Sequence, residues 1–532
     1  MSSVLIDGMT LACDDVASVA RRKKAVGIAP GVRERVERSC RAVEALTARN
    51  AVVYGITTGF GHLARVRISP DELGSLQRNL ILSHAVGTGS PLPDEVVRAM
   101  LLLRANSLAK GLSGVRFEVI EALVKFLEAD ICPLVPDKGS LGASGDLAPL
   151  AHLSLALLGE GNVRMGGVEM PAKEALGRAG IEPLVLRPKE GLALINGTQA
   201  MTAIGTLALH DAEALAATAD AAASLSIEAL RGISAAFDER LHDKARPHPG
   251  QAACARTLRA LLEGSRLVSA PGELRVQDAY SLRCIPQIHG ATMDALGYVK
   301  RVLETEINSA SDNPLVFEDG SVISGGNFHG QPVALAMDFL CMAVSELGSV
   351  SERRIERLLN PMLSELPAFL TRHGGVNSGF MIAHYTAAAL VSENKVLSSP
   401  ASVDSIPVSA SQEDHVSMGT IAARKARQVV DNVARVLAVE LMCACQAVDF
   451  RGPENLAPAT RAIYDAVRKV VPPLQEDRWL YPDLEAVTRL VAEGKIAQVV
   501  AAFSPWPAQD PPAPDQPTRN HLTQNQDATV EG

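Results

Sequence analysis

The sequence predicts a mainly α-helical protein, an elongated bundle of long central helices with a loop-rich N-terminal region. Long segments lack the alternation of apolar and polar residues that is typical of a strand. Hydrophobic residues make up 47% of the 532 residues but aromatic residues only 4%, so the core is aliphatic and suits close-packed helices. The long segments are residues 200–230, 288–310, 333–359, 379–397 and 416–447.

We expect four regions along the chain. Residues 1–195 form the N-terminal region with the glycine-rich loops at 54–61 and 139–146, and residues 196–450 form the central bundle. Within the bundle, the segment VALAMDFLCMAV at 333–344 is apolar nearly all round, which predicts a helix buried on every side. Residues 451–503 are expected to be helical, and the Pro-rich residues 504–532 to be a disordered tail.

Composition narrows the partners of the protein. The net charge of −9 and the absence of a basic stripe exclude nucleic acid as a partner. The eight scattered cysteines are typical of reduced thiols in the cytoplasm. No secretion signal and no uncharged apolar run of membrane-spanning length is found. We therefore expect a cytoplasmic protein that binds neither nucleic acid nor a membrane.

The N-terminal region contains a glycine-rich loop and a histidine. Residues 54–61, YGITTGFG, hold too many glycines for a helix. They form either a mobile surface turn or a lid, and the lid is favoured because Tyr54 and Phe60 are costly to expose. Residues 73–127 have a helical pattern that includes His84. A lone histidine there is more often a core residue than a functional one.

Residues 139–146, GSLGASGD, run directly into an apolar segment. The simplest interpretation is a turn and a helix start, with Asp146 as N-cap. An anion cradle is a second interpretation. The glycines fit neither the dinucleotide nor the P-loop pattern, however, and Pro133 and Pro136 interrupt any preceding strand.

A third interpretation is chemical. The backbone nitrogen of Gly145 attacks the carbonyl carbon of Ala143, and two dehydrations turn Ser144 into an exocyclic methylene. Glycine suits this turn because it has no Cβ and adopts unusual dihedral angles. The product is an electrophile, 4-methylidene-imidazol-5-one (MIO), built from Ala143, Ser144 and Gly145 without an external cofactor.

Polar residues between the helical segments are further candidates. Asn196 lies in the turn-like sequence GLALINGTQ. The sequence QDAYSLRC brings together Gln277, Tyr280 and Arg283. It is either a capped helix with an exposed arginine or a site for an amino-acid carboxylate, which a guanidinium binds in a bidentate manner.

Two later loops contain aromatic and acidic residues. The loop GGNFHG holds Phe328 and His329, and no second ligand lies at metal-binding spacing, so we expect no metal site. The stretch SVDSIPVSASQEDHVSM precedes the last long helix. Acidic residues are favourable at a helix N-terminus, which explains Asp414 without a function and leaves Glu413 as a candidate.

Residues 139–160, GSLGASGDLAPLAHLSLALLGE, resemble the signature of the aromatic amino-acid ammonia-lyases and aminomutases. The similarity extends from about Tyr54 to about Ala447, and within the family it is greatest to the histidine-specific members. The resemblance implies a histidase-like fold and a homotetramer whose active sites each combine three subunits. It also implies deamination of L-histidine to trans-urocanate and ammonia.

The resemblance also implies a role for each candidate around the electrophile. Tyr54 is expected to be the general base, with Glu413 as an alternative base. Asn196 would contact the substrate amine, and Phe328 would pack beside the prosthetic group.

Substrate recognition is assigned in the same way. Arg283 would bind the substrate carboxylate, with Gln277 and Tyr280 lining the same pocket. The pair Ser83-His84 resembles the histidine-specific form, so that His84 and Glu413 would bind the imidazole.

The sequence departs from the family pattern at several positions. Ser411 replaces a usual Asn, His384-Tyr385 replaces Gln-Val, and the segment NFHGQP is similar to that of tyrosine aminomutases. A tyrosine or phenylalanine ammonia-lyase, or a 2,3-aminomutase, therefore remains an alternative. An alternative of another class is a non-catalytic helical interaction protein.

Overall fold

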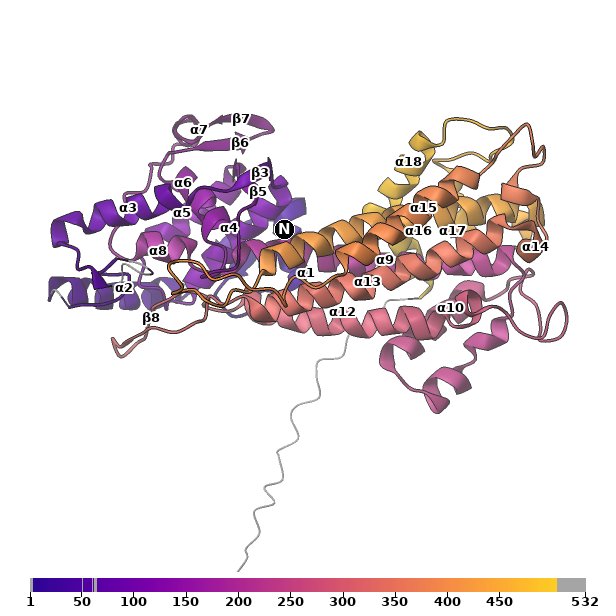
Figure 1. Cartoon of the computed structure of the whole chain (residues 1–532), viewed down its shortest axis with the longest axis horizontal. Coiled ribbons are helices and arrows are strands. Elements are labelled where there is room, and N and C mark those ends of the chain that lie inside the picture. The colour runs from indigo at the N-terminus through magenta and orange to yellow at the C-terminus, as the bar shows by residue number, and fades with distance from the viewer. Residues whose placement is uncertain (1–2, 50, 60, 62–64, 505–532) are drawn as a thin grey trace, which may run out of the picture.

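The computed structural model describes residues 3–49, 51–59, 61 and 65–504. The molecule is elongated (Figure 1), with the N-terminal helices and short strands at one end and long helices that extend to the other. Phe60 and the predicted tail from residue 505 onward lie outside the described residues.

The long helices form the predicted bundle and lie side by side (Figure 1). Each begins and ends within a few residues of its predicted segment, except that the last extends further at its C-terminus. The helices are α9 (Gln199–Ala229), α12 (Ile285–Ile307), α13 (Gln331–Leu359), α15 (Met381–Leu397) and α16 (Gly419–Arg451). Helix α9 lies at the centre, because nearly all of its residues are buried against its neighbours.

The expectation that residues 333–344 are buried on every side is wrong for a single chain. Leu335, Phe339 and Met342 are 47%, 40% and 44% exposed. They lie on one face of α13, which the other helices of the same chain leave uncovered. Among the described residues, α13 is also the one helix long and apolar enough to cross a membrane, but most of that stretch is buried, as in the core helix of a soluble protein.

The N-terminal region packs shorter helices against one end of the bundle. The helical pattern at 73–127 is divided into three helices, because residues between them form a strand and turns. The helices of this region are α1 (Cys13–Arg22), α2 (Val32–Ala48), α3 (Leu73–His84), α4 (Asp94–Ala109), α5 (Phe117–Glu128), α6 (Leu147–Leu157), α7 (Ala172–Ala179) and α8 (Glu190–Ile195).

Short strands accompany these helices. The pairs are β1 (Val4–Ile6) with β2 (Val26–Ile28), β3 (Thr88–Pro91) with β5 (Pro136–Lys138), β4 (Ile131–Pro133) with β6 (Asn162–Met165), β6 with β7 (Val168–Pro171), and β8 (Leu315–Val316) with β9 (Val322–Ile323). The expectation that prolines exclude a strand before the loop at 139–146 is wrong. Pro133 ends β4 and Pro136 begins β5, and strand ends tolerate proline.

The remaining helices pack around the bundle, and the junction of the last two reaches the cavity beside Arg21. These are α10 (Pro249–Leu262), α11 (Tyr280–Arg283), α14 (Pro361–Ser364), α17 (Pro458–Arg468), α18 (Tyr481–Ala492) and α19 (Lys495–Phe503). All eight cysteines are free thiols, and most are buried.

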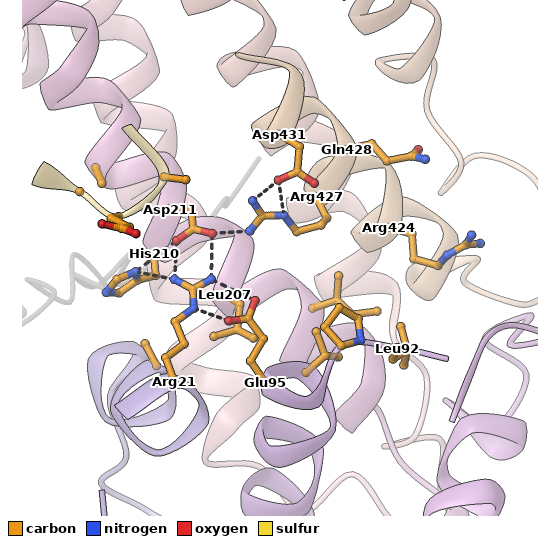
Figure 2. Close-up of a pocket in the computed structure, with 18 of the residues that line it drawn as sticks. Arg21, Leu92, Glu95, Leu207, His210, Asp211, Arg424, Arg427, Gln428 and Asp431 are labelled. Carbon is orange, nitrogen blue, oxygen red and sulfur yellow. Dashed lines mark hydrogen bonds and ion pairs between the residues drawn. The ribbon is translucent and has the colours of Figure 1, made fainter. Parts of the chain in front are cut away.

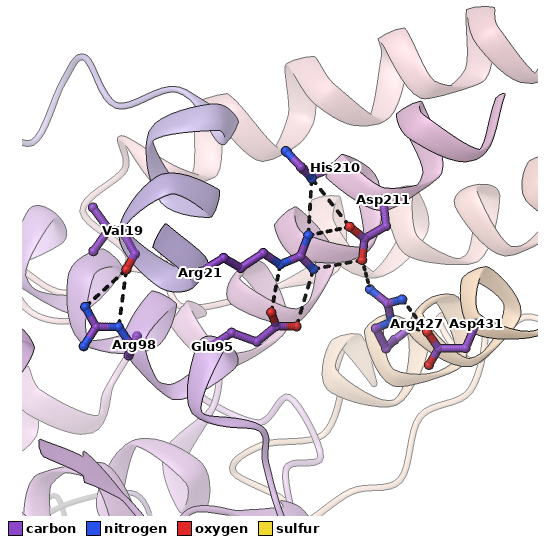
Figure 3. A network of polar contacts seen from close by, with 8 residues as sticks. All are labelled: Val19, Arg21, Glu95, Arg98, His210, Asp211, Arg427 and Asp431. Carbon is purple, nitrogen blue, oxygen red and sulfur yellow. Dashed lines mark hydrogen bonds and ion pairs between the residues drawn. The ribbon is translucent and has the colours of Figure 1, made fainter. Parts of the chain in front are cut away.

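An ionic network joins the N-terminal region to the bundle (Figure 3). Arg21 of α1 binds Glu95 of α4 at 2.8 Å and Asp211 of α9, and Asp211 also binds Arg427 of α16. Burial alone would raise the pKa of Asp211, but hydrogen bonds from His210 and Arg21 and the charge of Arg427 hold it well below its usual range. The network lines a cavity of about 950 Å³ (Figure 2), and its charges are already paired with one another.

Candidate active site

A second cavity, of about 1040 Å³, brings together residues from loops far apart in the sequence. Its walls come from the loop at 54–61, the end of α3, the loop before α6, the end of α8, and the loops before α13 and α16. The predicted site residues that line it are Tyr54, His84, Ser144, Asn196, Phe328 and Glu413.

The loop at 139–146 forms a compressed turn at this cavity. Gly142 and Gly145 pair across it as an isolated antiparallel bridge, and Ser144 between them has a φ of 53°. A Cβ on Gly145 would lie 2.1 Å from the carbonyl oxygen of Gly197, so only glycine fits. The turn therefore has the tightness and the residue types that cyclisation between Ala143 and Gly145 requires.

Asp146 fixes this turn in an unexpected way. It occupies the predicted N-cap position of α6, but its side chain makes no capping hydrogen bond to that helix. Instead it accepts from the backbone N–H of Met201, at the start of α9, at 2.8 Å, and from the hydroxyls of Ser140 and Thr420. Burial raises its pKa, and these hydrogen bonds offset part of the effect.

Glu413 faces the turn from the opposite wall. Ser144 Oγ donates to Glu413 Oε1 at 3.3 Å. A tight hairpin presents the carboxylate, and Ser409, Ala410 and Ser411 within it all have positive φ values, of 54°, 52° and 64°. Left-handed backbone is costly in residues other than glycine, and such strain is concentrated at functional sites.

His84 lies at the end of α3 beside the same cavity. Its Nδ1 is 3.0 Å from the hydroxyl of Ser83. Burial lowers its pKa, while a backbone hydrogen bond at Leu80 and the charge of Glu413 partly oppose that effect. The imidazole is therefore neutral near pH 7 and able to exchange hydrogen bonds with a polar ligand.

Tyr54, Asn196 and Phe328 complete the part of the site that one chain supplies. The hydroxyl of Tyr54 accepts from the backbone N–H of Gly61 at 3.2 Å. The amide nitrogen of Asn196 donates to the carbonyl of Asn313 at 3.0 Å, and its Oδ1 is buried with no partner in the described part of the chain. Phe328 is half-buried at the cavity wall.

The structure does not bring Gln277, Tyr280 and Arg283 into this cavity. They lie at the N-terminal end of α12, whose other end approaches the cavity. A helix of 23 residues is about 35 Å long, so Arg283 is too distant to reach a substrate beside Ser144. Tyr280 is 69% exposed, and the Arg283 guanidinium lies 4.5 Å from the centre of its ring.

Other residues at the site were not predicted, because no sequence pattern indicated them. Asn313 and Gln412 line the cavity, and Lys189 and Asp312 form a buried ion pair beside Asn196. The sequence around Asp312 and Asn313 has an ordinary turn composition, and the partners of a buried pair lie far apart in the sequence.

One group of metal-ligand side chains occurs among the described residues, away from the cavity. Asp220, Cys254 and His289 are buried between α9, α10 and α12. Asp220 Oδ1 already accepts from His289 Nδ1 at 2.7 Å and from Cys254 Sγ at 3.1 Å. Burial raises the pKa of the Cys254 thiol, so the group is a hydrogen-bonded triad in which the cysteine keeps its proton.

Comparison with known proteins places the fold and the cavity in one class. The chain is 60% identical over 498 residues to the histidine ammonia-lyase of Symbiobacterium thermophilum, covering 93% of this chain and 98% of the relative. It is 56% identical over 486 residues to the histidine ammonia-lyase of Bacillus subtilis, covering 91% and 96%.

Solved structures agree with this comparison. Histidine ammonia-lyase from Trypanosoma cruzi superposes with a TM-score of 0.88 at 45% identity, over 95% of this chain and 96% of that one. Tyrosine aminomutase from Streptomyces globisporus superposes with a TM-score of 0.92 at 41% identity, over 94% and 99%.

Together with these relatives, the fold and the cavity identify an ammonia-lyase. The chain belongs to the aromatic amino acid lyase family, whose family model matches residues 11–469. This is a family in which the electrophile is derived from the polypeptide itself.

Proposed function

We propose that the protein is a histidine ammonia-lyase, which releases ammonia from L-histidine and forms trans-urocanate. The observation that carries the proposal is that His84 and Glu413 share one cavity with Ser144. A neutral imidazole and a carboxylate suit the two nitrogens of a substrate imidazole, which are a donor and an acceptor. Relatives that carry this name are 53–60% identical to the chain.

The electrophile is proposed to be MIO, formed from Ala143, Ser144 and Gly145. When formed, it supplies an electrophilic carbon that activates the substrate amine. The compressed turn supports ring closure, because it holds Gly145 against Gly197 where no side chain fits. Asp146 holds the start of α6 to α9 and α16, so the turn is fixed before it reacts.

The remaining residues hold the substrate and move a proton. The side-chain oxygen Oδ1 of Asn196, which is buried without a partner in the described part of the chain, accepts a hydrogen bond from the substrate ammonium. Phe328 packs beside the ring of the prosthetic group. Tyr54 is the proposed base for the β-proton, and Glu413 is the alternative because it also faces Ser144. Both side chains line the cavity.

We infer that the site is completed by other copies in a homotetramer. Arg283, Gln277 and Tyr280 have the groups to bind the substrate carboxylate but lie about a helix length from Ser144 of their own chain. The uncovered apolar face of α13, which includes Phe339, supplies a surface for a second copy. Free, buried cysteines support a location in the cytoplasm.

A tyrosine aminomutase is the second candidate. It is supported by the close superposition with the enzyme from Streptomyces globisporus and by the segment NFHGQP, which resembles that of tyrosine aminomutases. The histidine enzyme is favoured because the aminomutase is 41% identical, whereas the histidine ammonia-lyases of Symbiobacterium thermophilum and Bacillus subtilis are 60% and 56% identical.

The deciding experiment is turnover on L-histidine, L-tyrosine and L-phenylalanine, with identification of each product. Urocanate from L-histidine as the preferred reaction supports the proposal. Coumarate or a β-amino acid from L-tyrosine as the preferred product would assign the second candidate. An intact mass without the loss of two water molecules, together with no turnover, would indicate a non-catalytic protein.

A further inference from the structure

A buried ion pair lies directly behind Asn196. Lys189 Nζ donates to Asp312 Oδ2 at 2.6 Å, and both side chains are fully buried. Lys189 immediately precedes the short helix α8 and Asn196 immediately follows it. Both ends of α8 therefore contact the same carboxylate, since Asp312 Oδ1 also accepts from Asn196 Nδ2 at 3.4 Å.

The acceptors around Asn196 determine which way its amide points. Its nitrogen faces the carboxylate of Asp312 and the carbonyl of Asn313, which can only accept hydrogen bonds. The amide oxygen must then point away from them, and it is buried without a partner at the wall of the cavity. A buried acceptor without a partner is costly, and a substrate ammonium would remove that cost by donating to it.

The position of Asn196 is held from its backbone as well. The guanidinium of Arg104 donates to the carbonyl of Asn196 at 3.0 Å and to Gln199 Oε1 at 2.8 Å. Arg104 is fully buried, and burial lowers its pKa to about 10, an effect that the charge of Asp312 opposes. The carboxylate of Asp312 therefore lies near two buried basic side chains, those of Lys189 and Arg104, and beside the amide of Asn196.

The ion pair is not required to attach α8 to the rest of the fold. Glu190, the first residue of that helix, is bound by Arg116 through two hydrogen bonds of 2.7 Å each. Burying Lys189 and Asp312 is costly, because desolvation of two charges can exceed their attraction. Lys189 also has a left-handed backbone, with a φ of 76°. A costly pair that duplicates an existing attachment points to a role in the site.

We propose that Lys189 and Asp312 are positioning residues, which fix the amide of Asn196 with its oxygen toward the substrate ammonium. This proposal rests on the proposed function of the cavity. Lys189 holds the carboxylate in place, and the carboxylate holds the amide nitrogen away from the cavity. If the amide of Asn196 rotated so that its nitrogen and oxygen exchanged places, its N–H groups would face the substrate ammonium. Binding of the amine would then weaken.

The test is a double-mutant cycle in the full-length enzyme between Asp312→Asn and Asn196→Ala. An asparagine at 312 has one acceptor where the aspartate has two, so either Lys189 or Asn196 loses its partner. We expect Asp312→Asn to lower kcat/KM for L-histidine about 10- to 100-fold, the effect of about 1.4–2.8 kcal/mol. In the Asn196→Ala background the same change should lower kcat/KM less than about threefold. An equal loss in both backgrounds would overturn the proposal.

Lys189→Met is the second variant, in case Asp312→Asn does not fold. Lys189→Met should also lower kcat/KM much less in the Asn196→Ala background than in the unchanged enzyme. An equal loss of kcat/KM in both backgrounds would again count against a positioning role. Glu440→Gln is the matched control, because Arg354 and Glu440 also form a fully buried pair, between α13 and α16. Glu440→Gln should lower the melting temperature. Its effect on kcat/KM should be the same in the unchanged enzyme and in the Asn196→Ala background.

The activity of the unchanged enzyme distinguishes a failure of the proposed function from a failure of the positioning role. If it releases no urocanate from L-histidine, the proposed function is refuted. If it is active and the cycle is additive, only the positioning role is refuted.

Discussion

Ser144 Oγ and Glu413 Oε1 lie 3.3 Å apart, although 269 residues separate them in the sequence. Loss of the serine hydroxyl as water would turn the Cβ of Ser144, which carries that hydroxyl, into the reactive methylene carbon. Glu413 is therefore placed to act on a substrate held at that carbon.

Replacing Glu413 by Gln should separate ring formation from turnover. We expect the intact mass of Glu413→Gln to show the loss of two water molecules, because the residues that form the turn are unchanged. We expect kcat to fall about 100-fold or more, the usual contribution of a group that transfers a proton or binds a reacting substrate. Ser144→Ala should show the full mass and no turnover. Unchanged kcat in Glu413→Gln would refute a role for this carboxylate.

Gly145→Ala should prevent the ring from forming. Its Cβ would approach the backbone carbonyl of Gly197 to 2.1 Å, and the backbone there cannot move like a flexible side chain. The expected result is an intact mass without dehydration and no urocanate. Gly177→Ala is the control, because a Cβ there has nothing within 4 Å, and it should keep both the ring and the activity. A dehydrated, active Gly145→Ala protein would contradict the geometry of the turn.

His84→Leu should reduce the preference for histidine. It removes a neutral imidazole from the cavity wall, and leaving a buried polar group of the substrate without its hydrogen bond costs about 1–3 kcal/mol. We expect kcat/KM for L-histidine to fall about 10- to 100-fold relative to that for L-tyrosine. Competition assays with both amino acids measure this ratio directly, and a ratio that does not change would exclude His84 from substrate recognition.

Two inactive variants should restore activity to each other if sites are shared between chains. Ser144→Ala and Arg283→Met each remove a different part of the site. When both are produced together, roughly a quarter of the sites in randomly mixed oligomers combine an intact Ser144 with an intact Arg283. Each variant produced alone should be inactive. No recovery in verified mixed oligomers would show that the two residues act within one chain.

Glu228→Gln should change the pH dependence of stability. Glu228 is buried between α9 and the C-terminal helices, and burial raises its pKa despite hydrogen bonds from Ser265, Thr460 and the backbone of Ala457. Between its ordinary pKa of 4.5 and its raised value, the folded protein retains a proton that the unfolded chain has lost. Its contribution to stability therefore decreases as pH rises through that window.

The variant carries a neutral side chain at every pH. Its melting temperature relative to the unchanged protein should therefore rise as pH increases above about 4.5 and then level off. Thermal unfolding measured at a series of pH values tests this. A difference that stays constant with pH would show that folding does not raise the pKa of Glu228.

The sequence by itself determined the long helices and the chemistry of the turn. Helical periodicity depends on neighbouring residues, so the segments that became α9, α12, α13, α15 and α16 could be predicted with small errors at their ends. The types of Ala143, Ser144 and Gly145 are compatible with a self-made electrophile, but by themselves they fit a simple turn before a helix equally well.

Only the tertiary structure decided which candidates meet. It joined Ser144 to Glu413, used Asp146 to hold the start of α9 rather than to cap α6, and left Arg283 at the far end of α12. It also paired Lys189 with Asp312 behind Asn196. The hydrogen bonds among them link residues 55 to 269 positions apart, and they depend on how whole helices pack rather than on any local pattern. The substrate carboxylate is therefore expected to be bound by a second copy of the chain.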